Sequence, residues 1–207
     1  MIPAAAAKLA AVLALVLPSF WSTMPAKEIL MGQSEQETCM SLKSPRCLNP
    51  HTENKAGGPN QEYGFGVFQL TNTRQYNNFE MMKRQVPALR NWQWSDRFNL
   101  QNQVIAGVVM DRGFYQSCSR LMKPGRDSVA CMLSSYNGGF GGFQADRRLC
   151  GNTKGCDPTV WFGNVEQVST KSKKPRGTYS VSAYQINREY VKNIWYTRSS
   201  KYKGMVK

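Results

Sequence analysis

The sequence has little acidic charge and a single histidine. Of its 207 residues, 13 are Asp or Glu and 27 are Lys or Arg, which gives a net charge of +14 and a pI near 9.7. Such a surface attracts polyanions such as nucleic acid, an anionic cell wall or a membrane face, and charge alone does not choose among them. The basic residues are densest in 171–176 and 198–203, a pattern typical of either solvated loops or a polyanion contact.

The chain also lacks a Gly/Ser-rich linker, an internal repeat and much strand-like alternation. Hydrophobic residues make up 41% of the chain and aromatic residues 11%, which allows a buried core and argues against disorder. We expect a hydrophobic N-terminal segment, 1–24, and one mainly α (α+β) domain, 25–207. Helices are predicted from Pro25 to about Glu37, from Ser95 or Asp96 to about Cys118, from about residue 126 to Tyr136 and from about Ser182, with loop over 39–61 and at most a small β-hairpin between Gly64 and Arg74.

No apolar run reaches the roughly 20 residues of a membrane-spanning helix. The range 2–21 is apolar apart from Lys8 and Ser19, and its uninterrupted core is Leu9–Leu17. A short apolar core after a lysine is typical of a secretory signal. The segment is consistent with a cleaved signal, an uncleaved anchor that contacts the inner membrane through residues 2–21, or a helix with no role in export.

Six cysteines, an even number, are typical of disulfides in an oxidising compartment. Proximity favours the pairs Cys39–Cys47 and Cys150–Cys156, which leaves Cys118 with Cys131. Free buried thiols are the alternative for that last pair. A zinc site competes with the disulfides, but it needs close ligand pairs such as Cys-x2-Cys, which the chain does not have. We therefore expect no metal.

Three motifs carry the candidate chemistry. Glu37 ends a predicted helix, and a carboxylic acid in apolar surroundings can stay protonated near neutral pH and act as a general acid. The stretch 62–69, Glu-Tyr-Gly-Phe-Gly-Val-Phe-Gln, combines glycines that allow close backbone approach with the amide of Gln69. Tyr136 and Asn137 place a phenol and an amide on the last turn of a helix. Taken singly, these are typical of a surface glutamate, a tight turn and a helix C-cap.

In this order, the motifs resemble the soluble lytic transglycosylase family, which has a goose-type lysozyme-like fold. Phage and bacterial cell-wall enzymes with Gln-Glu-Thr-Cys and Glu-Tyr-Gly-Phe-Gly segments look closer still. The chain departs from the family at Thr38, at Val67-Phe68, and in the wider gap between Glu37 and Asn49-Pro50, which an insertion bounded by Cys39 and Cys47 would explain. We prefer Glu37 to Glu35 as the family's glutamate. The matches, over about residues 27–200, are Glu37-Thr38, Gly66-Val67-Phe68-Gln69, Ser135-Tyr136-Asn137-Gly138-Gly139 and Arg188-Glu189-Tyr190-Val191.

The resemblance implies cleavage of the β-1,4 bond between N-acetylmuramic acid and N-acetylglucosamine in peptidoglycan. Glu37 would protonate the glycosidic oxygen and then act as base toward the C6 hydroxyl of the muramic acid, with no cofactor. Tyr190 would orient Glu37. The residues that would bind or orient the glycan strand are Gln69, Tyr136, Asn137, Glu62 and Phe68.

Two alternatives stay open. A lysozyme would hydrolyse the same bond with Glu62 or Glu53 as a second carboxylate. A non-catalytic basic module would bind polyanions without cleaving them. The implied setting is the periplasm, reached by export or by delivery from a phage virion whose proteins would be partners, and nucleic acid is not an expected partner.

Overall fold

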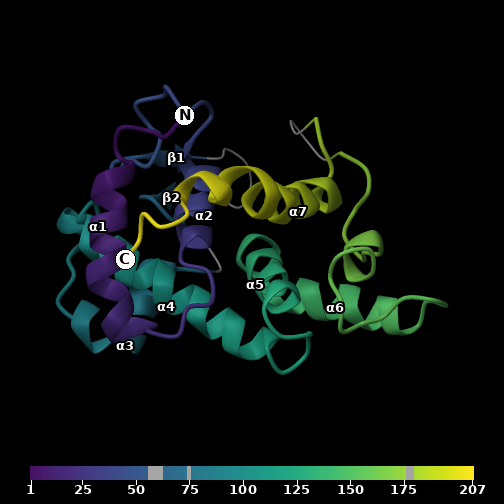
Figure 1. Ribbon diagram of the computed structural model, residues 1–207. Helices are drawn as coiled ribbons and strands as arrows, with labels where there is room; N and C mark the ends of the chain where they lie inside the picture. The colour runs from purple at the N-terminus through teal and green to yellow at the C-terminus, as the bar shows by residue number, and fades with distance from the viewer. Residues whose placement is uncertain (56–62, 74–75, 176–179) are drawn as a thin grey trace. The chain divides into compact units, whose positions relative to one another are not determined.

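The structure is a computed structural model, and it describes residues 1–55, 63–73, 76–175 and 180–207 (Figure 1). Within these ranges the chain is mainly helical, as expected, with seven α-helices and one small three-stranded antiparallel sheet. It divides into two compact units, residues 1–109 with 196–207, and residues 110–195. The helices are α1 (Ala6–Phe20), α2 (Glu28–Thr38), α3 (Asn78–Gln85), α4 (Leu100–Cys118), α5 (Arg126–Gly138), α6 (Phe140–Gly151) and α7 (Ala183–Lys192).

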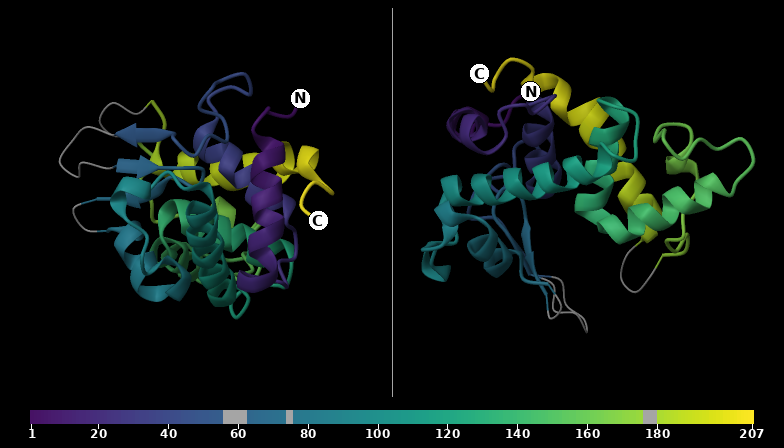
Figure 2. Two further views of the ribbon diagram at one scale, coloured as in Figure 1. Left: turned by 90° about the vertical axis from the view of Figure 1, so that its left-hand side faces the viewer. Right: turned by 90° about the horizontal axis from the view of Figure 1, so that it is seen from below.

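The N-terminal apolar segment forms α1, which packs against α2 in the first unit (Figure 2). Leu9, Leu13 and Leu17 recur every four residues and are buried, because that spacing places them on one face of the helix. Leu15, on the opposite face, is 73% exposed. None of the helices in the described part of the chain has the length and hydrophobicity to cross a bilayer. Cleavage or anchoring of this segment stays a prediction.

The sheet is larger than the hairpin that the sequence predicts. β2 (Tyr63–Phe65) and β3 (Leu70–Asn72) form that hairpin, and β1 (Glu53–Lys55) adds a third strand within a range expected to be loop. In the antiparallel register, Asn54 pairs with Gly64, which pairs with Thr71. The order β1-β2-β3 follows the chain, so each strand pairs with its neighbour in sequence.

The turn between β2 and β3 depends on glycine and on α4. Gly66 has φ +79°, and a Cβ atom there would lie 2.4 Å from the side chain of Gln103. The Gln103 amide accepts a hydrogen bond from the N–H of Val67 at 3.0 Å and donates to the carbonyls of Pro50 and Arg97 at 2.9 and 2.8 Å. The side chain of Gln103 therefore fixes the turn that connects β2 to β3.

The second unit is built on α5, α6 and α7. Buried Asp146 of α6 accepts hydrogen bonds from Ser169 and from the Thr170 backbone, and forms ion pairs with Lys171 at 3.0 Å and Arg188 at 2.9 Å. Burial alone would raise the pKa of the Asp146 carboxyl, but these donors together outweigh it and hold the pKa below its usual value. The carboxylate thus links α6 to α7 and to the loop between them.

All six cysteines form disulfides, in the three pairs that the sequence favours: Cys39–Cys47, Cys118–Cys131 and Cys150–Cys156. Cys118–Cys131 joins the end of α4 to α5, where free buried thiols were the alternative. Each bridge closes a short loop, which restricts the unfolded chain.

Candidate functional site

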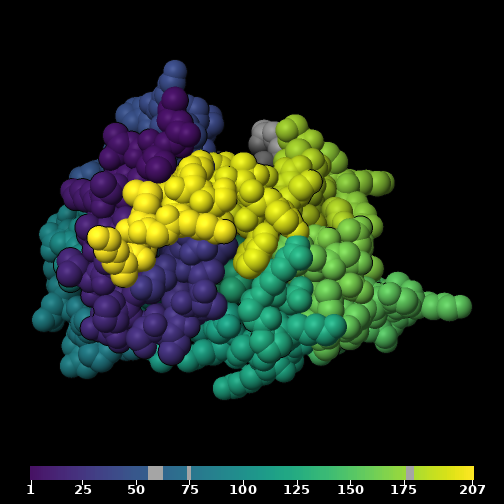
Figure 3. All heavy atoms as spheres, in the orientation of Figure 1, coloured from purple at the N-terminus to yellow at the C-terminus, as the bar shows by residue number. Residues whose placement is uncertain are grey.

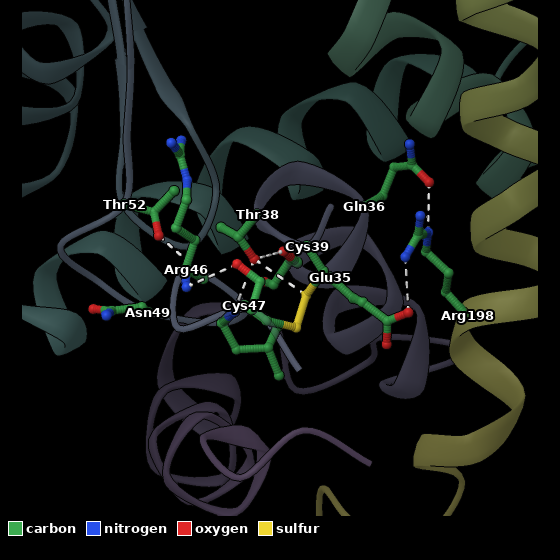
Figure 4. Close-up of a disulfide and its surroundings, with 12 residues drawn as sticks. Glu35, Gln36, Thr38, Cys39, Arg46, Cys47, Asn49, Thr52 and Arg198 are labelled. Atoms are coloured by element: carbon green, nitrogen blue, oxygen red, sulfur yellow. Dashed lines mark hydrogen bonds and ion pairs between the residues drawn. A yellow bond between two sulfur atoms is a disulfide. The ribbon is translucent and has the colours of Figure 1, made fainter. Parts of the chain in front are cut away.

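Glu37 lies in the last turn of α2, and its side chain is partly buried. The Thr38 hydroxyl donates to the carbonyl of Ser34 at 2.6 Å and accepts from the N–H of Leu48 at 2.9 Å. The Cys39–Cys47 disulfide begins at the next residue (Figure 4). The helix end that carries Glu37 is therefore fixed to the following loop, through the hydrogen bond from Leu48 to Thr38 and through the disulfide.

The neighbouring carboxylate, Glu35, is occupied by an ion cluster. Its side chain is 1% exposed. Arg198 and Lys201 donate to its Oε1 at 2.8 and 2.9 Å, and the Tyr202 hydroxyl donates to Oε2. Burial and the Glu35 charge raise the pKa of Tyr202, so the phenol stays a proton donor in the hydrogen bond. Glu35 serves to hold the C-terminal segment.

The C-terminal segment packs closely along α2. Arg198 ends a π-helical turn, η4 (Asn193–Arg198), and also donates to Gln36 at 2.6 Å. Gly32 meets the backbone of Ser199, because a Cβ atom on Gly32 would lie 2.9 Å from its nitrogen. Figure 3 shows the end of the chain, in yellow, against the purple N-terminal part. These contacts place the residue before Glu37 in direct contact with Arg198.

A second carboxylate lies on β1. Glu53 accepts from the Tyr63 hydroxyl and pairs with Arg97 at 3.4 Å, while Arg97 also donates to the Tyr63 oxygen at 3.2 Å. The hydrogen bond from Tyr63 lowers the pKa of Glu53, with help from Arg97, and burial opposes this only partly. Glu53 is thus ionised near neutral pH and suits an acceptor or a base better than an acid.

The stretch before β3 is built into the sheet. Phe68 is fully buried against Gly107 of α4, and Gln69 is 8% exposed. The Gln69 amide donates to the carbonyls of Thr52 and Gly66 at 3.1 and 2.8 Å, and its oxygen accepts from Asn54 at 2.9 Å. These bonds use both Gln69 protons, so the amide supports the turn. Glu62 lies outside the described residues.

In the second unit, α7 holds the end of α5 through a residue that the sequence did not single out. Asn187 donates to the Asn137 side chain at 3.1 Å and to the carbonyl of Ser134 at 3.0 Å, and accepts from the Ser134 hydroxyl at 2.9 Å. Asn137 is exposed, Tyr136 is half-buried, and Tyr190 is 4% exposed. Asn187 precedes Tyr190 by one helical turn, so the two residues lie on the same face of α7. This spacing is the signal in the sequence that could have identified Asn187.

The predicted residues therefore fall into two sets. Glu37, Phe68 and Gln69 belong to the first unit, while Tyr136, Asn137 and Tyr190 belong to the second. The structure joins Asn137 to the helix of Tyr190. In the described ranges, no three His, Cys, Asp or Glu side chains gather as they would around a metal ion. No protein-family model, curated protein or solved structure matches the chain.

Proposed function

We propose that the protein is a peptidoglycan lytic transglycosylase with Glu37 as its acid and base. The observation that carries the proposal is the difference in solvent exposure between two neighbouring carboxylates, 1% at Glu35 against a partly exposed Glu37. Glu35 is held by Arg198, Lys201 and Tyr202. Glu37, two residues later, is partly exposed at a helix end that Thr38 and a disulfide fix in place. A catalytic acid needs this combination of access and a rigid support.

The proposed reaction uses one carboxyl group twice. The Glu37 proton passes to the glycosidic oxygen, and the bond from that oxygen to C1 of N-acetylmuramic acid breaks. The Glu37 carboxylate then takes the proton of the C6 hydroxyl, and this oxygen bonds to C1 to close a 1,6-anhydro ring. Because the sugar supplies its own nucleophile, the step needs no water and no second carboxylate.

The arrangement of the first unit supports a lysozyme-like fold. The helix that carries Glu37 leads through a disulfide-closed loop into a small antiparallel sheet. Tyr190 would orient Glu37, and Gln69, Phe68, Tyr136 and Asn137 would shape or line the glycan cleft, as the resemblance implies. For Gln69 this action is through the turn, since its amide is bonded internally.

The setting that we propose is the periplasm, reached by export or by delivery from a phage virion. Three disulfides fit an oxidising compartment. A charge of +14 fits an anionic cell wall, because it raises the rate of encounter with a polyanion. Peptidoglycan strands are the proposed partner, and contact of residues 2–21 with the inner membrane and of the protein with virion proteins remain further proposals.

The test is mass spectrometry of the products released from purified peptidoglycan. The wild type should release anhydro-muropeptides, and Glu37→Gln should release them at least about 100-fold more slowly, the usual contribution of a general acid. Glu35→Gln is the matched control: well below its melting temperature it should keep most of the activity. Full activity of Glu37→Gln would refute the residue assignment.

The nature of the products also decides between the proposal and its rivals. Reducing-end muropeptides would indicate a lysozyme, for which ionised Glu53 is the available second carboxylate. Binding of cell walls with no soluble product from either protein would indicate a non-catalytic module. Either result would refute the transglycosylase.

A further inference from the structure

The first unit carries an exposed aromatic residue, Trp94, to which the proposed reaction assigns no role. Trp94 lies in η2 (Trp94–Asp96), a short 3-10 turn before α4, and is 41% exposed. Its aromatic neighbours Phe65 and Phe79 are buried, and its third aromatic neighbour, Tyr63, is partly buried. A large ring left in solvent beside a buried aromatic cluster forgoes burial energy, which makes it a candidate contact for a ligand.

The Trp94 ring is fixed although it is exposed. Phe65 and Phe79 meet it edge to face, with ring centroids 5.5 and 5.2 Å away. The Arg97 guanidinium carbon lies 4.9 Å from the ring centroid, and Arg97 also donates to the Trp94 carbonyl at 3.2 Å. A ring held in this way loses little conformational entropy when a ligand packs on it.

Two hydrogen-bonding groups beside the ring are unused. Among the described residues, the Trp94 indole N–H and the Glu53 Oε2 atom make no hydrogen bond. The other Glu53 oxygen, Oε1, is bonded to Tyr63 and Arg97, which holds the carboxylate in place. We call Trp94, Arg97, Tyr63 and Glu53 the tryptophan site. It offers an apolar ring, one donor and one anionic acceptor.

This chemistry fits a neutral, hydroxyl-rich ring better than a phosphate. Each guanidinium nitrogen of Arg97 already donates one hydrogen bond, to Trp94, Tyr63 or Glu53, and the Glu53 carboxylate also pairs with its charge. The unused Glu53 oxygen would repel a phosphate and would accept from a sugar hydroxyl. An N-acetyl carbonyl would accept from the indole N–H, while the C–H face of the pyranose packs on the ring.

We propose that the tryptophan site binds one N-acetylhexosamine unit of a glycan strand, as a secondary contact separate from bond cleavage. This inference rests on the proposed function for its choice of ligand. It assigns Trp94 as the stacking residue and Glu53 as the acceptor of a sugar hydroxyl.

The test is isothermal titration of the soluble tetramer of β-1,4-linked N-acetylglucosamine into the Glu37→Gln protein, which does not turn the probe over. Adding Trp94→Ala should weaken binding about tenfold, and Trp94→Phe should recover part of the loss because a ring remains. Glu53→Gln keeps the shape but not the charge and should weaken binding about threefold. Tyr76→Ala is the control, since Tyr76 is 68% exposed in the same unit and should leave binding unchanged.

Binding that stays within about twofold in Trp94→Ala would overturn the inference, as would failure of the parent protein to bind the tetramer. If Trp94→Ala instead weakens the binding of single-stranded DNA and leaves tetramer binding unchanged, the site belongs to nucleic acid. That result would also overturn the inference. If Trp94→Ala lowers the melting temperature so far that the variant is unfolded in the assay, the binding of Trp94→Phe and Glu53→Gln decides the test. Anhydro-product release by the wild type without tetramer binding refutes this inference alone. Tetramer binding without anhydro product refutes the transglycosylase alone.

Discussion

Replacing Glu35 by Gln should destabilise the protein far more than the same change at Glu37. Glu35 is 1% exposed and bonded to Arg198 and Lys201 at 2.8 and 2.9 Å, so the substitution leaves two cations without their counter-charge. Removing one partner of a buried ion pair costs about 3–5 kcal/mol. The Arg198 and Lys201 side chains keep 22% and 20% of their surface in solvent, so water offsets part of the loss. We expect the low end, about 3 kcal/mol.

For a chain of this size, each kcal/mol lowers the melting temperature by about 2–4 °C, which predicts a shift of about 6–12 °C for Glu35→Gln. The assay is thermal unfolding followed by circular dichroism at pH 7 with the disulfides intact. Glu37→Gln makes the identical chemical change on a partly exposed side chain and should shift the transition by less than about 4 °C. Tyr202→Phe removes one hydrogen bond to the carboxylate and should fall between them.

A Glu35→Gln protein that melts within about 2 °C of the wild type would refute this reasoning. So would a larger loss for Glu37→Gln, because it would make Glu37 the structural carboxylate. The second result would also remove the observation that carries the proposed function.

Three further predictions concern stability. Gly66→Ala should cost about 2 kcal/mol or more in urea unfolding, because φ is +79° and the new Cβ would meet an α4 side chain, whereas Gly113→Ala, in open space within α4, should not destabilise. Replacing Cys118 and Cys131 together by Ala should lower the free energy of unfolding in urea by about 3 kcal/mol, as expected for a loop of this length. Reducing the disulfides of the wild type should not make it more stable than the oxidised protein. The lowered pKa of Asp146 contributes stability above the ordinary carboxyl pKa that is lost as pH falls below about 4, so Asp146→Asn should flatten unfolding curves measured from pH 2 to 6.

Local signals in the sequence predicted the helices with clear ends. Ser182 caps α7 by accepting from the N–H of Gln185, and α5 begins at the expected residue 126. The long helix was predicted to begin at Ser95 or Asp96, but these residues belong to the 3-10 turn η2, and α4 begins at Leu100. Neither side chain caps that turn, whereas Asn99, just before α4, accepts a hydrogen bond from the N–H of Asn102 at 3.1 Å.

Elements that depend on distant contacts were missed. α6 begins Phe140-Gly141-Gly142, and glycine disfavours helix, so nothing local predicts it. Tertiary contacts hold it, through buried Asp146 and the disulfide of Cys150. β1 was hidden in a range rich in Pro, Gly and Asn, because a three-residue strand is defined by its partner β2 and not by its own residues.

The candidate site, like the fold, has features that local sequence indicates and features that depend on distant contacts. Motif order singled out Glu37 and its companions, which remain predictions. It could not show what Glu35 binds, since Arg198 lies 163 residues away and no spacing rule connects them. Nor could it show that the Gln69 amide turns inward, because its acceptors are the backbone carbonyls of Thr52, just before β1, and Gly66, just after β2.

The Glu35 cluster has a consequence for the order in which the protein is made. Ribosomes add about 5–20 residues per second, so Arg198 follows Glu35 by roughly 8–30 s. Residues 110–195 form one unbroken stretch and can pack as soon as they leave the ribosome, whereas the first unit needs residues 196–207 to neutralise its buried carboxylate. The nascent chain therefore carries Glu35 without its arginine until codon 198 has been translated, and a premature stop before that codon would leave the charge permanently without its arginine.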